Sequence, residues 1–202
     1  MKVFLSILIL IFSIQPFTKA DDINDFKMEE LSLGDSLLNF YNKKQIIEEM
    51  NSEYAFFYKD NKFVKLSIGK TNEFYMRTNL KIYDEIGVTI KPDDKNFIIY
   101  GLSGDILCQD DIQYCYTKQK KIISDLKVFF NNDVIIDKYE DKHWVDETGK
   151  SIVKVTEILS KNKKLLISVS VYDMNEDLGY ADQVSVEIAS NEYEKFLRNI
   201  AN

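Results

Sequence analysis

The chain has 202 residues and a formal net charge of −7 at pH 7, with 45% hydrophobic residues. This length is sufficient for one domain with its own hydrophobic core. An acidic protein is repelled by phosphate backbones and anionic lipid head groups, so the charge disfavours nucleic acid and membrane surfaces as partners. We therefore expect partners that are neutral or cationic.

The first twenty residues have the layout of a secretory signal peptide. A positive start at Lys2 precedes an apolar run over residues 3–14, Pro16 follows, and Ala20 places a small residue at the cleavage position. The alternative is an uncleaved anchor, but the run is shorter than the roughly 20 apolar residues that a membrane-spanning helix needs. We predict a signal peptide over residues 1–20 and export to the periplasm or the medium.

The remaining residues, 21–202, are predicted to form a single domain. Pro92 is the only proline after the leader, glycines are scattered singly, and no linker or repeat interrupts the pattern. Removal of Lys2 and Lys19 with the leader changes the net charge to −9.

Two short helical segments open this domain, and strands follow them. Leu37 begins a short apolar helical turn, and Asn42 to Gln45 has the pattern of a capping box that starts a second helix. From Tyr54 the apolar residues alternate, which predicts a hairpin with its turn at Asp60 and Asn61. Further strands are expected over the ranges 73–83, 87–91 and 96–108.

The most regular helix is predicted from Ile112 to Phe130, because apolar residues recur there every three or four positions. Four more strands and a last helix, capped by Asn191, complete the pattern. Short turns between strands require antiparallel pairing. We predict an α+β fold in which an antiparallel sheet of hairpins and meanders carries helices packed on one face.

Cys108 and Cys115 are the only cysteines of the chain. In an oxidising compartment an isolated pair is expected to form a disulfide. Cys108 ends a predicted strand, and Cys115 lies one turn inside the long helix, so the bond would fasten the helix to the sheet. Two buried free thiols are the alternative, and redox chemistry is disfavoured because six residues separate the pair.

Residues Gly34-Asp35-Ser36-Leu37 resemble the nucleophile block of the GDSL hydrolases, in which the serine attacks an ester. That chemistry also needs a base and oxyanion donors. The only histidine, His143, stands in a block one residue shorter than the family requires, and no Gly-x-Asn-Asp block occurs. We therefore interpret Gly34 as a turn and Asp35 or Ser36 as a helix cap.

Two other groups of side chains are weaker candidates. Asp173, Asn175 and Asp177 have part of the spacing of a calcium loop, but its glycine is displaced and its twelfth-position acid is missing, so we predict no metal ligand and no cofactor. Outward-facing aromatic residues would form a ligand platform if the fold gathered them, the candidates being Tyr54, Phe56, Phe57, Tyr58, Tyr172 and Tyr180. The neighbours His143 and Trp144 are interpreted as packing residues.

Three segments together resemble a group of exported proteins from marine bacteria with small AT-rich genomes, a group without an assigned activity. The segments are LSLGDSLLNFYNKKQI, KNFIIYGLSGDILC and HWVDETGKSIVKV. The resemblance implies that the Gly-Asp-Ser sequence is a structural turn.

We predict a soluble exported protein, most readily a non-enzymatic module that binds a small ligand or an envelope protein. A GDSL-like serine esterase using Ser36 is the alternative. A role in outer-membrane assembly is a third hypothesis, disfavoured because no lipid-attachment cysteine follows the leader.

Overall fold

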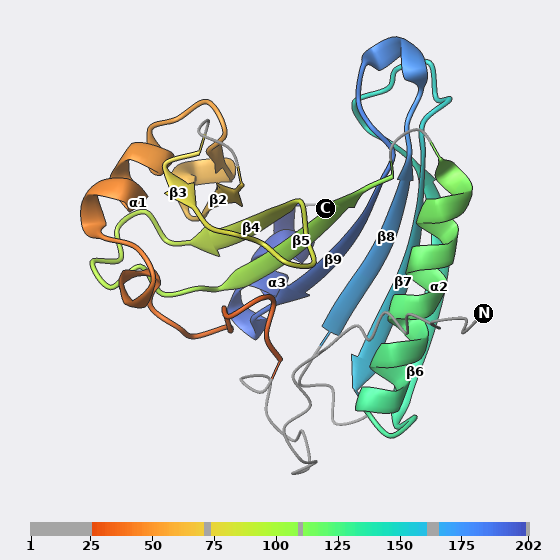
Figure 1. Cartoon of the computed structure of the whole chain (residues 1–202), viewed down its shortest axis with the longest axis horizontal. Helices are drawn as coiled ribbons and strands as arrows, with labels where there is room; N and C mark the ends of the chain where they lie inside the picture. The colour runs from red at the N-terminus through yellow and green to blue at the C-terminus, as the bar shows by residue number, and fades with distance from the viewer. Residues whose placement is uncertain (1–25, 71–73, 109–110, 161–165, 201–202) are drawn as a thin grey trace, which may run out of the picture.

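The computed structural model describes residues 26–70, 74–108, 111–160 and 166–200. The predicted signal peptide over residues 1–20 therefore lies outside the described residues. The described chain forms a mixed fold in which a large sheet dominates and three α-helices, α1 (Lys43–Met50), α2 (Ile112–Phe129) and α3 (Asn191–Ile200), accompany it (Figure 1). The described residues also form 3-10 turns: η2 (Leu37–Asn39) before α1, η3 (Lys59–Asn61) between α1 and α2, and η4 (Glu176–Leu178) between α2 and α3.

Eight strands are hydrogen-bonded in the order β1-β2-β4-β5-β9-β8-β7-β6, and every pair in this order is antiparallel. The short β3 pairs in parallel with β2 outside this path. The strands are β1 (Phe56–Phe57), β2 (Val64–Gly69), β3 (Met76–Arg77), β4 (Glu85–Ile90), β5 (Gly101–Leu107), β6 (Val134–Lys142), β7 (Ile152–Ser160), β8 (Leu166–Asp173) and β9 (Gln183–Ala189).

The chain crosses the sheet once through its long helix. It leaves β5, passes along α2 to the far edge, and returns as the meander β6 to β9, which ends beside β5. The pairing of β5 with β9 thus joins the first half of the sheet to the second.

Local signals explain the helix starts. The capping box predicted for α1 is confirmed, because the Asn42 side chain accepts from the Gln45 amide at 3.0 Å and Gln45 Oε1 accepts from the Asn42 amide at 3.2 Å. Asp111 accepts from two amides at the start of α2. The cap of α3 is Ser190, one residue before the predicted Asn191, since its Oγ accepts from the Tyr193 amide at 3.3 Å.

One predicted strand is largely absent. In the described part of the range 73–83, only the two residues of β3 are in a strand, and the segment that follows them is irregular. There the Glu29 carboxylate accepts from the amides of Lys81 and Ile82, each at 2.8 Å. A side chain thus satisfies backbone donors that a strand partner would otherwise have to satisfy.

The main core lies on one face of the sheet. Because side chains alternate along a strand, each strand from β2 to β8 contributes apolar residues to this face, among them Leu66, Ile86 and Val169, which are fully buried. The helix α2 packs on β8 and β9 with Ile123 and Leu126 turned inward. Residues 26–46 extend the same core.

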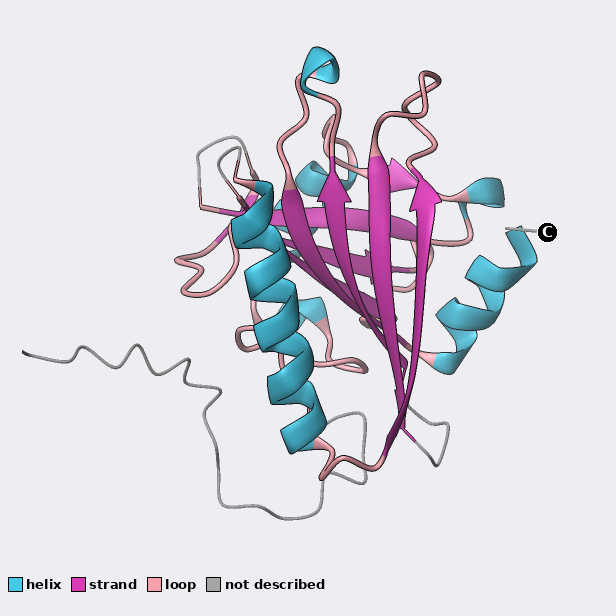
Figure 2. Ribbon diagram, turned by 90° about the vertical axis from the view of Figure 1, so that its right-hand side faces the viewer, coloured by secondary structure: helices cyan, strands magenta, loops and turns pink. Residues whose placement is uncertain are grey.

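The last helix lies on the opposite face, as Figure 2 shows. Its Tyr193 and Phe196 form a separate aromatic cluster with Phe63, which precedes β2. The α+β class and the antiparallel sheet are thus confirmed, but the helices do not share one face. The reason is that α3 follows β9 directly and its apolar side meets aromatic residues that the strand alternation places on the second face.

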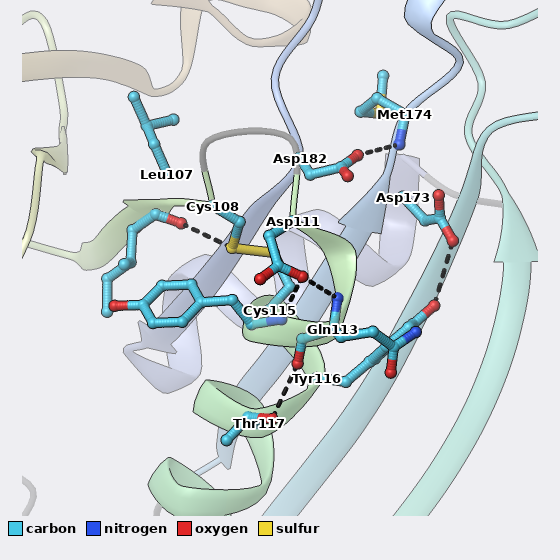
Figure 3. Close-up of a disulfide and its surroundings, with 12 residues drawn as sticks. Leu107, Cys108, Asp111, Gln113, Cys115, Tyr116, Thr117, Asp173, Met174 and Asp182 are labelled. Atoms are coloured by element: carbon cyan, nitrogen blue, oxygen red, sulfur yellow. Dashed lines mark hydrogen bonds between the residues drawn. A yellow bond between two sulfur atoms is a disulfide. The ribbon is translucent and has the colours of Figure 1, made fainter.

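The disulfide is present as predicted. Cys108 and Cys115 are bonded, with their Cα atoms 5.7 Å apart, and the bond ties the end of β5 to the first turn of α2 (Figure 3). The Cys108 amide donates to the Asp182 carbonyl at 2.9 Å, so the β8–β9 connection meets the same corner.

Candidate functional site

The face that carries α3 presents a row of short or acidic side chains. In register across seven strands, from β2 to β6, the row contains Ser67, Gly87, Ser103, Glu187, Ser168, Glu157 and Asp137. Serine and glycine occupy little space above a sheet, so the row leaves room over the central strands. This open space lies beside the aromatic cluster of α3.

Gly87 determines where the lysine of this face can lie. A Cβ at this position would collide with Lys65 Cε and with Ser103 Oγ. Without that carbon the Lys65 side chain extends from β2 across β4 toward β5. The ammonium therefore lies beside Ser103 and away from the edge of the sheet.

The helix α3 forms the wall of this space. A Cβ on Gly101 would lie 2.7 Å from the Tyr193 ring, so the glycine lets the helix approach the sheet closely. The Tyr193 hydroxyl donates to the Tyr58 hydroxyl at 2.5 Å, and the Phe63 ring centroid lies 5.0 Å from that of Phe196.

Between α3 and the sheet lies a groove of about 340 Å³. We call it the α3 groove; it is lined principally by Tyr58, Lys65, Ser103, Ser168, Glu187 and Leu197. A second hollow of about 330 Å³ shares Glu157, Leu166, Glu194 and Arg198 with it and continues toward β6. The groove is within the size range of small-molecule sites.

The charges of the groove influence one another. Loss of hydration alone would lower the pKa of Lys65, but the carboxylates of Glu187 and Asp105 outweigh that effect, so the pKa lies above its ordinary value. Burial raises the pKa of Glu187, and the Lys65 ammonium offsets part of the rise. The Glu187 side chain reaches solvent through the groove, yet protein surrounds it closely enough to displace much of its hydration.

Glu85 lies at the margin of this face. Desolvation raises its pKa, although the carboxylate accepts a hydrogen bond from Ser67 Oγ at 2.6 Å. This hydrogen bond joins β2 to β4 on the second face.

Three polar groups of the groove form no hydrogen bond or ion pair with the described residues. Ser103 is 4% exposed, and its Oγ has no hydrogen-bond partner among the described residues. In the same described part of the chain, no hydrogen bond or ion pair engages the Lys65 ammonium or the Glu187 carboxylate. Buried polar groups are normally hydrogen-bonded. The groove therefore offers a donor, a hydroxyl and an acceptor to a ligand.

The residues of the esterase hypothesis lie in different environments. Ser36 Oγ donates to the Asn96 carbonyl at 2.5 Å and accepts from the Leu38 amide at 3.2 Å, so it caps η2, and Gly34 adopts a positive φ of 85°. His143 lies at the end of β6, where its ring packs against Tyr172 with centroids 5.6 Å apart. Among the described residues, no hydrogen bond joins Ser36 to His143.

The partial calcium pattern is divided among three structural roles. Asp173 accepts from the Tyr116 hydroxyl at 3.2 Å, Asn175 caps η4, and Asp177 forms an ion pair with Lys150 at 3.4 Å. Within the described ranges, no three His, Cys, Asp or Glu side chains gather as metal ligands.

The aromatic candidates do not gather as one platform, although Phe56 and Tyr58 are in contact with ring centroids 4.9 Å apart. Tyr58 lines the α3 groove, whereas Tyr172 packs on His143. Trp144 stacks on His143 with ring centroids 5.9 Å apart but is 84% exposed, so it packs against its neighbour outside the core.

The residues that matter most in the groove escaped the sequence analysis. Lys65, Ser103 and Glu187 each stand at an alternate position of a strand, a pattern that equally describes an ordinary solvated face. The signal that distinguishes them is Gly87 opposite Ser103, and it becomes visible only when the register is known.

Together these observations define an α+β protein with a groove on the second face of its sheet. The chain matches no protein-family model, and neither a curated protein nor a solved structure is significantly similar to it. None of the described helices combines the length and the apolar character needed to cross a bilayer.

Proposed function

We propose that this protein is a non-enzymatic binding module that holds a small ligand in the α3 groove. The observation that carries the proposal is the set of unpartnered polar groups there: the Lys65 ammonium, the Ser103 hydroxyl and the Glu187 carboxylate. The buried Ser103 hydroxyl lacks a hydrogen bond, which costs free energy, and a ligand that completes this bond recovers that cost. The two charges beside it would orient such a ligand.

The chemistry of the groove supports binding over catalysis. The pKa of Lys65 lies above its ordinary value, because the nearby carboxylates outweigh the loss of hydration, so the side chain remains a protonated donor at neutral pH. A general base would need a pKa lowered toward the working pH. Lys65 therefore serves as a fixed positive charge that orients a ligand.

The test is a screen of small metabolites by NMR on isotopically labelled protein. Ligands are expected to shift the amide resonances of β9 and α3. Ser168→Phe fills the groove and should abolish those shifts, whereas Ser168→Ala, the matched control, should preserve them. Binding that persists with the groove filled, or a screen in which no compound perturbs the groove, would contradict the proposal.

We further propose that the protein works outside the cytosol, in the periplasm or the medium. The layout of residues 1–20 and the disulfide between Cys108 and Cys115 support this location, since disulfides persist in oxidising compartments. Mass spectrometry of the native protein should find Asp21 at the amino terminus in the periplasmic or extracellular fraction. An intact Met1 in the cytosolic fraction would contradict it.

A further inference from the structure

We infer that the α3 groove binds a small zwitterion, an amino-acid-like molecule whose carboxylate meets Lys65 and whose ammonium meets Glu187. This inference rests on the proposed function and names the ligand class for the same site. It follows from the order of the polar groups along the row, from the charge balance of the lining and from the character of the wall.

The order of the groups places a positive and a negative site side by side. Lys65 extends over Gly87, Gly87 is in register with Ser103, and Ser103 is in register with Glu187 on the next strand. Neighbouring strands are about 4.8 Å apart. The two charges thus flank one buried hydroxyl without forming an ion pair with each other. A ligand with its own opposite charges a few ångströms apart can satisfy both.

Ser103 is suited to the position between them. A hydroxyl can donate to a carboxylate and accept from an ammonium. The Ser103 side chain is almost fully buried, so water reaches it poorly, and its Oγ has no partner among the described residues. A bound zwitterion would satisfy this hydroxyl together with both charges.

The charge balance disfavours simpler ligands. Apart from the Glu194–Arg198 ion pair at 2.8 Å, the lining holds one cation, Lys65, and two carboxylates, Glu157 and Glu187. A plain anion would satisfy Lys65 but would be repelled by the carboxylates. A plain amine would satisfy Glu187 but would lie beside the Lys65 ammonium.

The remaining wall is suited to a neutral or apolar side group. Leu166, Ala189 and Leu197 line the groove together with the Tyr193 ring. An aliphatic or aromatic substituent next to the charged groups would cover these side chains and remove their apolar surface from water.

The experiment is isothermal titration calorimetry on protein purified after expression of the full chain. The probes are L-alanine, L-leucine and L-phenylalanine, with two matched halves of leucine, namely 3-methylbutylamine, which lacks the carboxylate, and 4-methylpentanoate, which lacks the ammonium. At least one amino acid should bind, and each half-molecule should bind at least about tenfold more weakly than leucine, because each leaves one charge of the groove unpaired.

Two variants test which end of the amino acid each charged residue of the groove binds. Lys65→Met should weaken the best amino acid at least about tenfold without weakening the amine, which loses a repulsive neighbour, whereas Glu187→Gln should weaken the amino acid without weakening the acid. Lys150→Met, in the remote β6–β7 loop, is the control and should change nothing. An amino acid that binds to both groove variants as tightly as it binds to the native protein would overturn the inference.

The outcomes also separate this inference from the proposed function. If no amino acid binds but another compound of the metabolite screen shifts the resonances of the groove, the zwitterion is wrong and the binding module stands. If no compound of either set affects the groove, both are wrong.

Discussion

The two faces of the sheet are built from the same strands and differ in how they are covered. On one face, α2 and residues 26–46 cover aliphatic side chains such as Leu66 and Val169. On the other, α3 packs through a small aromatic cluster and leaves the groove open beside it. Adjacent residues of one strand therefore lie in different environments, the packed core on the first face and the groove on the second.

This separation has an energetic basis. Removal of aliphatic side chains from water is the dominant favourable term in folding, and the first face contains most of the buried apolar residues. The second face keeps the Glu187 carboxylate, whose ionised form is disfavoured by the loss of hydration and only partly stabilised by Lys65. Substitutions can thus test whether the two faces are independent.

The largest effect is expected from neighbouring residues of β8. Ile167 is fully buried on the first face, and Ser168 lies on the second. Ile167→Ala should lower the free energy of unfolding by about 2–5 kcal/mol, because it removes buried methyl groups and leaves a cavity. Ser168→Ala should change it by less than about 0.5 kcal/mol. Urea unfolding of both variants measures the difference, and equal losses would show that the faces are not energetically distinct.

The disulfide should give the next largest effect. Cys108 and Cys115 are separated by seven positions, and closing so short a loop stabilises the fold by about 2–3 kcal/mol in the chain-entropy account. Cys108→Ala combined with Cys115→Ala should lower the unfolding midpoint in urea accordingly. Binding in the α3 groove should persist where the variant is folded, since the bond lies at the start of α2. A variant as stable as the native protein would show that the bond is dispensable.

Helix caps provide a finer comparison. Asp111 caps α2 and Ser190 caps α3, each through its side-chain oxygen. Replacing either by alanine should cost about 1 kcal/mol. Asp111→Ala should reduce global stability alone, whereas Ser190→Ala should in addition weaken ligand binding, because α3 forms the wall of the groove. Unfolding curves combined with calorimetric titration distinguish the two, and unchanged binding in Ser190→Ala would argue against α3 as an essential wall.

Local patterns were sufficient to predict part of this structure. The capping box at Asn42, the long amphipathic helix and the bond between Cys108 and Cys115 each depend on residues close together in the chain, and each is confirmed. The predicted strand over residues 73–83 is mostly wrong, because Glu29, far away in sequence, satisfies the backbone there. A prediction from the local sequence cannot include a contact with a residue so far away in the chain.

The groove could not be predicted from the sequence, because its prediction requires the register between strands that are far apart in the chain. Alternating polar residues predict that one face of a strand is open to solvent, but they do not indicate which strands are neighbours. Lys65, Ser103 and Glu187 come together only because β9 returns to lie beside β5 after the α2 crossing. The position of α3 was unpredictable for the same reason, since its partner Phe63 precedes the second strand.

The smallest predicted effect concerns the charge of Glu187. Because burial raises the pKa of this carboxyl above its value of 4.5 in the unfolded chain, the folded state binds the proton more tightly, and stability falls as the pH rises through the two values. Glu187→Gln removes the ionised group, so without ligand the variant should be more stable than the native protein at about pH 7 and similar to it at about pH 3.5. Lys65→Met should steepen this pH dependence in the native carboxylate background, because the ammonium that partly stabilises the ionised Glu187 is lost. Thermal unfolding across this pH range measures both, with Lys150→Met as the control. A variant Glu187→Gln that is less stable at neutral pH would show that the carboxylate has a stabilising partner in the fold and is not held ready for a ligand.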